Sequence, residues 1–367
     1  MRHLLPRSES IDLHRRGFLS VVGSALGGLA WVGLIGCNQS ANPSPGQPKK
    51  WRLGLSSPHK AEILNEFYED MRKEAARSAI GVEFVIVDAD GNAVKQMSDL
   101  EAFVAQGYEG IFFIALPSDG LESIVASAVK KGIPIFNHGA SPVTGCTQNV
   151  VLDQHQSGYE VGKFAARWIN EKHGGKAEVG VIGNQSDPWL RIRLQGMKDG
   201  LKEHAPGSQV VAETHGHTID LGASGAANML QAHPAMKILL AHADDPGFGA
   251  CQAATEAGKI NPDQFLVASA DGTRLVLDKI AQGGIYQATW SYLFSYSSAA
   301  FMRDMLKLLN GEKIAPTRTQ GGRLVTKENL NEIVLLGKNA QAPESEKYYG
   351  DSTIMRYSET PLTTPKV

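Results

Sequence analysis

The feature that most constrains the fold is an alternation of short apolar runs with longer amphipathic stretches, and this pattern occurs twice along the chain. The apolar runs have the length and composition of strands, whereas the stretches between them have helical periodicity. A continuous apolar run such as residues 111–114 indicates a strand covered on both faces. The alternation as a whole is typical of right-handed βαβ units built around a parallel sheet.

The pattern begins at Trp51 and restarts after residues 150–153. In the first half we expect strands at 51–55, 82–87, 110–114 and 133–136, and helices at 59–79, 92–106 and 120–131. In the second half we expect strands at 178–182, 209–214, 237–241, 265–269 and 286–290, and helices at 155–173, 189–204, 220–232, 246–258, 272–281 and 294–310. The sequence therefore predicts an α/β protein with two similar lobes, each a parallel sheet flanked by helices.

Ligands of open parallel sheets bind beyond the carboxyl ends of the strands, so the loops that follow the strands are the places to search. Most of these loops carry polar side chains able to form hydrogen bonds. They are residues 56–60, 88–92, 115–119, 137–141, 183–187, 243–245, 270–273 and 291–294.

The N-terminus has the features of an export signal. Arg15 and Arg16 precede a glycine-rich apolar run over residues 20–35, and a small residue stands directly before Cys37. Paired arginines are typical of the twin-arginine address, and the small residue before cysteine is typical of a lipoprotein cleavage site. A transmembrane anchor is the alternative, but a span needs about 20 strongly apolar residues and the glycines weaken this run. We expect residues 1–37 to be the signal, with cleavage and lipidation at Cys37.

The segment 38–50 is rich in Pro, Ser, Asn and Gln and reads as a flexible tether. The expected location is thus the periplasm or the outer face of the membrane. Cys146 and Cys251 remain in the folded part, in a compartment that permits disulfides. Two free thiols are the expectation, although the spacing of the cysteines does not determine whether they pair.

Charge and motifs exclude several functions. The chain has 36 basic and 38 acidic residues, so it has no strongly basic face and nucleic acid is not an expected partner. The sequence contains no nucleophile elbow, phosphate-binding loop, His-Glu-x-x-His or Cys-x-x-Cys motif. His215 and His217 offer two imidazoles without an identifiable third ligand, and Asp244 suits a helix start. We therefore expect no enzyme activity, no cofactor and no metal.

An ordered set of short segments over residues 51–335 resembles the periplasmic sugar-binding proteins of the ribose and galactose type. The segments are Gly107-Tyr108-Glu109-Gly110-Ile111, Lys131-Gly132-Ile133-Pro134-Ile135, Gly158-Tyr159-Glu160-Val161-Gly162, Arg191-Ile192-Arg193-Leu194-Gln195-Gly196 and Ala270-Asp271-Gly272-Thr273. Sugar-responsive repressors share this fold, but they carry a DNA-binding unit where this chain has an export signal. The resemblance implies the type 1 periplasmic binding protein fold and a protein that delivers a sugar-like ligand to the permease of an ABC importer. A receptor for a sensor kinase or chemoreceptor is the alternative.

The resemblance also implies a domain plan. Lobe 1 would comprise residues 51–153 and 293–322, and lobe 2 residues 154–292 and 323–337, with a three-segment hinge between them. Such proteins close on their ligand as monomers. Residues 338–367 exceed the usual end of the family, and no role is predicted for them.

Three ligand contacts follow from the resemblance. Arg191 falls where the family places an arginine that donates to sugar hydroxyls, Asp271 where an aspartate accepts from them, and Asp187 where the galactose branch has a contact. A guanidinium only donates and a carboxylate only accepts, so hydroxyls, which do both, can bridge them. A solvated salt bridge is the alternative interpretation.

The chain departs from the ribose type at several positions. Asn137 and His138 stand where the ribose type has an aspartate and an arginine, so they are expected either to face a ligand or to form a structural turn. Trp189 and Tyr292 are candidates for the aromatic faces on which a sugar ring stacks, with a core position as the alternative for Trp189. Ser57 and His59 in the first loop are further candidates. These departures make ribose a poorer prediction than a sugar derivative, a polyol or a nucleoside.

Overall fold

The structure is a computed structural model that describes residues 50–60, 62–116, 119–139, 141–185, 187–332 and 355–362. The predicted signal with Cys37 and the tether up to residue 49 lie outside the described residues. So does most of the predicted C-terminal extension. Within the described ranges, no helix has both the length and the apolar character that crossing a membrane requires.

The first sheet has seven strands in the order β13-β11-β5-β4-β3-β1-β2. All neighbours are parallel except β13, which pairs antiparallel with β11. The strands are β1 (Lys50–Ser57), β2 (Gly81–Asp88), β3 (Gly110–Phe113), β4 (Ile135–Gly139), β5 (Gln148–Leu152), β11 (Thr317–Gln320) and β13 (Met355–Ser358). The helices of this lobe are α1 (Glu62–Ala75), α2 (Ala93–Ala105), α3 (Leu121–Lys130) and α9 (Phe294–Leu309).

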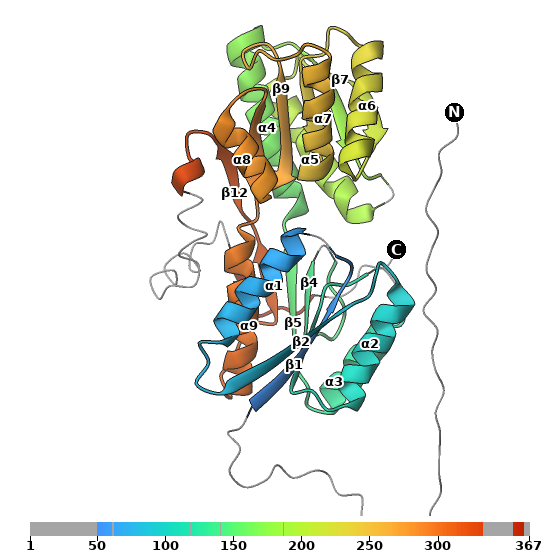
Figure 1. Cartoon of the computed structure of the whole chain (residues 1–367), viewed down its shortest axis with the longest axis vertical. Helices are drawn as coiled ribbons and strands as arrows, with labels where there is room; N and C mark the ends of the chain where they lie inside the picture. Colours follow the sequence, from blue (N-terminus) through green and yellow to red (C-terminus); the bar gives the residue numbers. More distant parts are fainter. Residues whose placement is uncertain are drawn as a thin grey trace, which may run out of the picture. The chain divides into compact units, whose positions relative to one another are not determined.

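Helices cover both faces of the first sheet (Figure 1). Side chains alternate along a strand, and β3 therefore serves two cores. Phe112 packs in the cluster that contains residues of α1 and α9, whereas Ile111 and Phe113 pack in the cluster that contains residues of α2 and α3. All three side chains are fully buried, as the continuous apolar run predicts.

The second sheet has six strands in the order β12-β10-β9-β8-β6-β7. They are β6 (Glu178–Gly183), β7 (Gln209–His215), β8 (Ile238–Ala241), β9 (Leu266–Asp271), β10 (Tyr286–Ser291) and β12 (Arg323–Thr326), of which β12 alone runs antiparallel to its neighbour. Its helices are α4 (Gln154–His173), α5 (Pro188–His204), α6 (Ile219–Ala232), α7 (Asp244–Glu256) and α8 (Arg274–Gln282). The prediction of two parallel sheets flanked by helices is confirmed.

Within residues 50–332 the chain passes between the two sheets three times. It leaves the first sheet after β5, returns after β10 and leaves again between β11 and β12. The backbone N–H of Asp153 in the first passage donates to the carbonyl of Gln320 at 2.9 Å, so two passages lie side by side. Arg356 of β13 forms an ion pair with Asp153, so the C-terminal strand contacts a passage between the sheets.

In the second lobe, the backbones of α4 and α5 pack unusually close together. A Cβ added at Gly158 of α4 would lie 1.9 Å from the carbonyl oxygen of Arg193, and one at Gly196 of α5 would lie 2.3 Å from that of His155. Only glycine permits such an approach between two helix backbones. This contact sets how far Arg193 stands from α4.

Two cysteines lie in the described part of the chain. Cys146 and Cys251 are both buried and free, with Cys146 in the first lobe and Cys251 on α7 in the second.

Candidate ligand-binding site

A cleft of about 380 Å³ lies where loops at the carboxyl ends of several strands meet. Its size falls within the range of small-molecule sites, roughly 300–1,000 Å³. His59, Ile63 and Glu66 come from the first lobe, and the remaining residues come from the second. These are Leu190, Arg193, His217, His242, Ala243, Asp245, Asp271, Thr273, Arg274 and Leu275.

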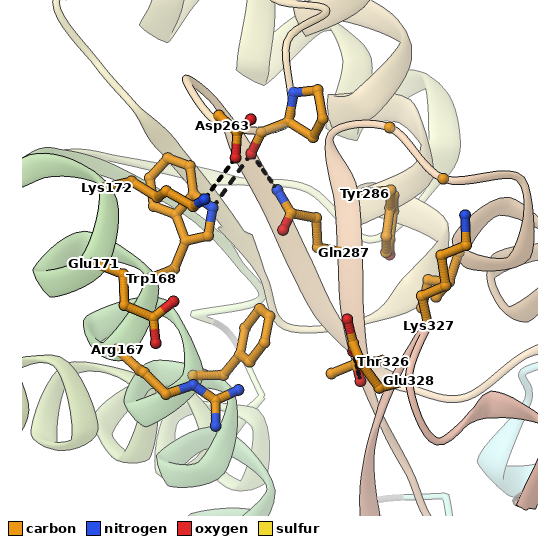
Figure 2. A pocket seen from close by; sticks show the side chains of 15 residues that line it. Arg167, Trp168, Glu171, Lys172, Asp263, Tyr286, Gln287, Thr326, Lys327 and Glu328 are labelled. Atoms are coloured by element: carbon orange, nitrogen blue, oxygen red, sulfur yellow. Dashed lines mark hydrogen bonds and ion pairs between the residues drawn. The ribbon is translucent and has the colours of Figure 1, made fainter.

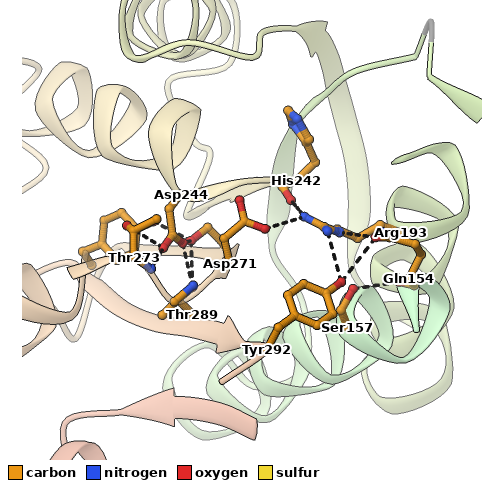
Figure 3. Close-up of polar contacts among 12 residues, drawn as sticks. Gln154, Ser157, Arg193, His242, Asp244, Asp271, Thr273, Thr289 and Tyr292 are labelled. Carbon is orange, nitrogen blue, oxygen red and sulfur yellow. Dashed lines mark hydrogen bonds and ion pairs between the residues drawn. The ribbon is translucent and has the colours of Figure 1, made fainter. Parts of the chain in front are cut away.

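Arg193 is the most tightly held cationic side chain of the cleft. It is 3% exposed, and its Nε donates to Oε1 of Gln154 at 2.8 Å. Nη1 donates to the carbonyl of His242 and to Oδ1 of Asp271 at 3.1 Å, and Nη2 donates to the hydroxyl of Tyr292 at 3.0 Å (Figure 3). These bonds use four of the five N–H groups of a guanidinium and leave one donor on Nη2.

Asp271 ends β9 and faces Arg193. Its side chain is 28% exposed, so one part meets the guanidinium and another part meets the cleft. Burial raises the pKa of the Asp271 carboxyl, and the adjacent Arg193 guanidinium opposes that rise. The pair presents a donor and an acceptor side by side, which suits ligands whose groups both donate and accept.

A second carboxylate, Asp244, lies behind this pair and is fully buried. Its Oδ2 accepts from the backbone N–H and the hydroxyl of Thr273 at 2.6 and 2.9 Å, and its Oδ1 accepts from the hydroxyl of Thr289 at 2.6 Å and from that of Ser269 (Figure 3). Burial, and after it the charge of Asp271, raise the pKa of Asp244 to about 7, while its donors oppose the rise.

Histidines line both sides of the cleft. His242 is buried, and burial together with the charge of Arg193 lowers its pKa to about 3, so this ring is neutral. His59 and His217 are exposed. The ring of His217 lies 5.5 Å from that of His215. Among the residues described, no group of three or more His, Cys, Asp or Glu side chains is arranged to hold a metal ion.

The structure brings Arg193, and not Arg191, to Asp271. Arg191 is exposed, and its Nη1 donates to the carbonyl of Gln185 at 2.9 Å. Residues two apart on a helix point in nearly opposite directions, at about 200°. A signal for Arg193 exists in the sequence, because it lies beside Leu194 and four residues before Met197 on the apolar face of α5, where a charged residue needs a partner.

The other second-lobe candidates hold local structure. Asp187 caps α5, because its Oδ1 accepts from the backbone N–H of Trp189 at 2.8 Å and of Leu190 at 3.2 Å. Trp189 is half-buried and does not line the cleft. Tyr292 is fully buried and contacts Arg193 from behind.

In the first lobe, the amide of Asn137 is used within the lobe. Its Oδ1 accepts from the N–H of Ala115 at 3.3 Å, and its Nδ2 donates to the carbonyl of Ser141 at 2.7 Å and to Oδ1 of Asn149 at 3.0 Å. The side chain is fully buried and does not line the cleft. These bonds connect β4 with β5 and with the loops that follow β3 and β4.

His138 is buried among aromatic rings. Its Nε2 lies 2.9 Å from the hydroxyl of Ser297, and the ring centroids of Phe67 and Phe301 are 4.8 and 5.4 Å away. Burial, and after it the charge of Arg318, lower the pKa of His138 to about 3. His138 is therefore a neutral histidine in the core of the first lobe.

The first loop contributes one cleft residue and one supporting residue. Ser57 is buried, donates to the carbonyl of His59 at 2.9 Å and accepts from the hydroxyl of Tyr68 at 2.7 Å. His59 lines the cleft itself. Ser57 therefore orders the loop that carries His59.

A second hollow, of about 500 Å³, lies between α4, β10 and β12 (Figure 2). Lys172 pairs with Asp263 at 2.7 Å across it, and Gln287 donates to the carbonyl of Pro262 at 2.7 Å. Tyr286 and Gln287 stand at the start of β10, whereas ligands of parallel sheets bind beyond the strands' carboxyl ends. The cleft, to which both lobes contribute, is therefore the better candidate for the ligand site.

Known proteins resemble the chain in sequence and in fold. The sequence model of the family described as periplasmic binding protein domain matches residues 54–313. The ribose import binding protein RbsB of Bacillus subtilis is 28% identical over 246 residues, which are 66% of this chain and 77% of that protein. The D-allose-binding periplasmic protein of Escherichia coli is 27% identical, covering 57% of this chain and 70% of that protein.

Among solved structures, a solute-binding protein of Bacillus halodurans with bound myo-inositol is 23% identical with a TM-score of 0.68. The match covers 78% of this chain and 98% of that one. A periplasmic solute-binding protein of Actinobacillus succinogenes with bound D-allose is 20% identical with a TM-score of 0.67. It covers 77% of this chain and 99% of that one. The likeness in fold therefore includes elements of both sheets.

Proposed function

Because the chain belongs to the periplasmic binding protein domain family, we propose that it is an extracytoplasmic solute-binding protein that delivers a sugar or sugar-like polar ligand to an ABC importer. The observation that carries this proposal is the Arg193–Asp271 pair in the cleft, since hydroxyl groups can accept from a guanidinium and donate to a carboxylate at once. The relatives that bind ribose and allose support the same ligand class. The chain binds a solute and is not an enzyme.

Binding would work by closure of the two lobes on the ligand. His59, Ile63 and Glu66 approach it from the first lobe, and Arg193 and Asp271 approach it from the second. A ligand that bonds to both sides favours the closed state over the open one, in proportion to its difference in affinity. The passages between the sheets would act as the hinge. The closed state is then what the permease of the importer would recognise.

We propose the lobes as residues 51–153 with 293–322 and residues 154–292 with 323–337, acting as a monomer. The sheet memberships of β5, β10, β11 and β12 support these limits.

The candidate contacts divide into two groups. We propose Asp271 and His59 as direct ligand contacts, because both line the cleft, and we add Arg193 through its remaining Nη2 donor. Tyr292 and Ser57 would support Arg193 and the His59 loop from behind.

For Asn137 and His138 we propose a structural role within β4, because their polar contacts lie within the first lobe. Asp187 would likewise cap α5. For Arg191 and Trp189, which do not line the cleft, we propose no direct ligand contact.

Export and anchoring are proposed from the sequence of the N-terminus alone. Residues 1–37 would be a twin-arginine-like signal, and Cys37 would carry the lipid that holds the protein at the membrane. In cells expressing the Cys37→Ser protein, the protein should move from the membrane fraction to the soluble exported fraction. Retention of the Cys37→Ser protein in the membrane fraction would contradict lipidation at this residue.

Isothermal titration of the purified protein against D-ribose, D-allose, myo-inositol and adenosine tests the ligand class. At least one of the polyols should release heat and raise the melting temperature. Asp271→Asn should weaken that binding about tenfold or more, since a hydrogen bond to a charged group contributes about 1.5–3 kcal/mol. The absence of heat and of a thermal shift with every compound would overturn the sugar assignment.

A further inference from the structure

We propose that Asp244 is a positioning residue of the cleft, whose buried carboxylate holds residues 271–273 in the conformation that aims the Asp271 carboxylate at Arg193 and the ligand. Asp244 does not line the cleft itself. The inference rests on the proposed function and adds Asp244, which acts on the ligand only through Asp271.

The backbone of Asp271 has an unfavourable conformation. Its φ is +133°, a region that residues with a Cβ rarely adopt, and the following Gly272 has a φ of +76°. Such a conformation costs free energy and persists only where surrounding contacts hold it. The turn is also tight, because a Cβ at Gly272 would lie 2.4 Å from the side chain of Ser291.

Asp244 supplies contacts that hold this turn. Its Oδ2 accepts the backbone N–H of Thr273 directly, two residues after Asp271. The N–H of Gly272 donates to the hydroxyl of Thr289 at 3.3 Å, and that hydroxyl in turn donates to Asp244. The two backbone amides that follow Asp271 are thus fixed by one carboxylate, directly or through a single threonine.

The same carboxylate connects separate elements of the second lobe. Ser269 belongs to β9, Thr289 to β10, and Thr273 precedes α8, while Asp244 itself begins α7 (Figure 3). The hydroxyl of Tyr286 on β10 lies 2.5 Å from that of Ser269 and extends the network into the core. The position of the turn is therefore tied to both neighbouring strands.

The network requires an ionised carboxylate. All four groups around Asp244 donate to it, and a carboxyl accepts at both oxygens without restriction only when it is ionised. Protonation makes one oxygen a donor and breaks at least one of the four bonds. None of the ion pairs among the described residues involves Asp244, so no contacting cation opposes protonation.

The titratable groups around Asp244 favour protonation near neutral pH. Asp271 lies at the end of β9 and Tyr286 on β10, Asp245 of α7 raises the pKa of Asp271, and His242, which precedes α7, is neutral. Arg193 of α5 lies beyond Asp271. Burial and the charge of Asp271 raise the pKa of Asp244 to about 7, so this residue titrates where binding is readily measured.

Protonation of Asp244 changes ligand affinity and folding stability in opposite directions. Ligand affinity falls as the pH falls through about 7, because protonation releases the turn. The contribution of Asp244 to folding stability changes the other way: its folded pKa is raised, so that contribution is full below the unfolded pKa of 3.8 and is lost as the pH rises through about 7. A residue with a merely structural role would show only the second trend.

The test compares the full wild-type chain with Asp244→Asn and with the matched control Asp304→Asn. Asp304 is a buried carboxylate of the first lobe that accepts from Gln148 at 2.9 Å and lies 3.6 Å from Arg318. Titrations use D-ribose, D-allose and myo-inositol between pH 6 and pH 8. Wild-type affinity should fall about tenfold from pH 8 to pH 6, because binding requires the ionised carboxylate and the ionised fraction of a group with a pKa of about 7 falls by about that factor over this range.

Asp244→Asn should bind about tenfold or more weakly at pH 8, with little further change down to pH 6. Asp304→Asn should keep the wild-type affinity and pH profile even if its melting temperature falls. The proposal is overturned if Asp244→Asn binds like the wild type at pH 8 or keeps the wild-type pH profile.

A measurement without ligand separates this proposal from the proposed function. Hydrogen exchange of a peptide spanning 270–275 should be faster in Asp244→Asn than in the wild type at pH 8, while peptides of α5 remain unchanged. Thr289→Val is a second variant, which also serves if Asp244→Asn does not fold. It removes a donor to Asp244 and the acceptor of the Gly272 N–H, so exchange of the same peptide should be faster in it as well. Unchanged exchange in both folded variants would refute the positioning role. If none of the three polyols binds to the wild type, the proposed function fails while the exchange result still decides whether Asp244 holds the turn.

Discussion

Removing the Arg193 side chain should be far more damaging than removing that of Arg191, although the two arginines are only two residues apart on α5. Arg193 is buried and donates to four acceptors, whereas Arg191 is exposed and donates to a single carbonyl. The two alanine variants therefore form a matched pair in sequence and in composition. The difference between their unfolding free energies measures what burial and the hydrogen-bond network of Arg193 contribute to stability.

The magnitude follows from the groups that Arg193→Ala leaves behind. Removing one partner of a buried ion pair costs about 3–5 kcal/mol. Asp271 is 28% exposed, so water can partly solvate its carboxylate and the lower end of that range applies. Gln154 and Tyr292 are buried and lose a hydrogen-bond partner as well. We expect a loss of about 3 kcal/mol for Arg193→Ala and within about 0.5 kcal/mol for Arg191→Ala, as for other exposed positions.

Urea unfolding at pH 7 measures the difference, provided that the dependence of the unfolding free energy on urea is the same in all three proteins. Titration with the polyol that binds the wild type provides a second reading. Arg193→Ala should lose binding, and Arg191→Ala should retain it. The reasoning is refuted if Arg193→Ala loses less than about 1 kcal/mol, or if Arg191→Ala is destabilised as much as Arg193→Ala.

Two further predictions concern the first lobe and the helix pair α4–α5. Burial lowers the pKa of His138 to about 3, so its neutral form is favoured in the folded state, and its contribution to stability is present above the unfolded value of 6.5 and lost as the pH falls toward 3. The glutamine of His138→Gln does not titrate. When the pH is lowered from 6.5 to 5, the unfolding free energy of this variant in urea should therefore fall by about 2 kcal/mol less than that of the wild type. An equal fall in both proteins would contradict a buried neutral histidine. Gly158→Ala should lose about 3 kcal/mol and bind the ligand more weakly, because its Cβ would meet the carbonyl of Arg193 at 1.9 Å. In the control Gly81→Ala the added Cβ meets only the flexible Lys50 side chain, so the unfolding free energy should change by less than about 1 kcal/mol. A Gly158→Ala protein as stable as this control would show that α4 and α5 can move apart to accept the methyl group.

Local pattern was sufficient to predict the architecture. Buried parallel strands must be continuously apolar, and covering helices must be amphipathic, so segments such as β3 and α5 were recognisable without knowledge of their neighbours. Asp271 was also identified correctly as a residue at the end of a strand, and the structure places it in the cleft. The strand that contains residues 355–358 was not predicted, because its partner β11 lies far away in the sequence.

The chemistry of the site depended on contacts that only the tertiary structure specifies. Which arginine of α5 meets Asp271 is decided by the rotation of that helix against α4, which close packing at glycines determines. Asn137 was predicted to follow a strand that ends at residue 136, but it lies within β4, and its amide is bonded to Ala115, Ser141 and Asn149, which only folding brings together. Periodicity along the chain thus determined which segments form the two sheets, whereas the direction and partners of each polar side chain were decided by packing between segments distant in sequence.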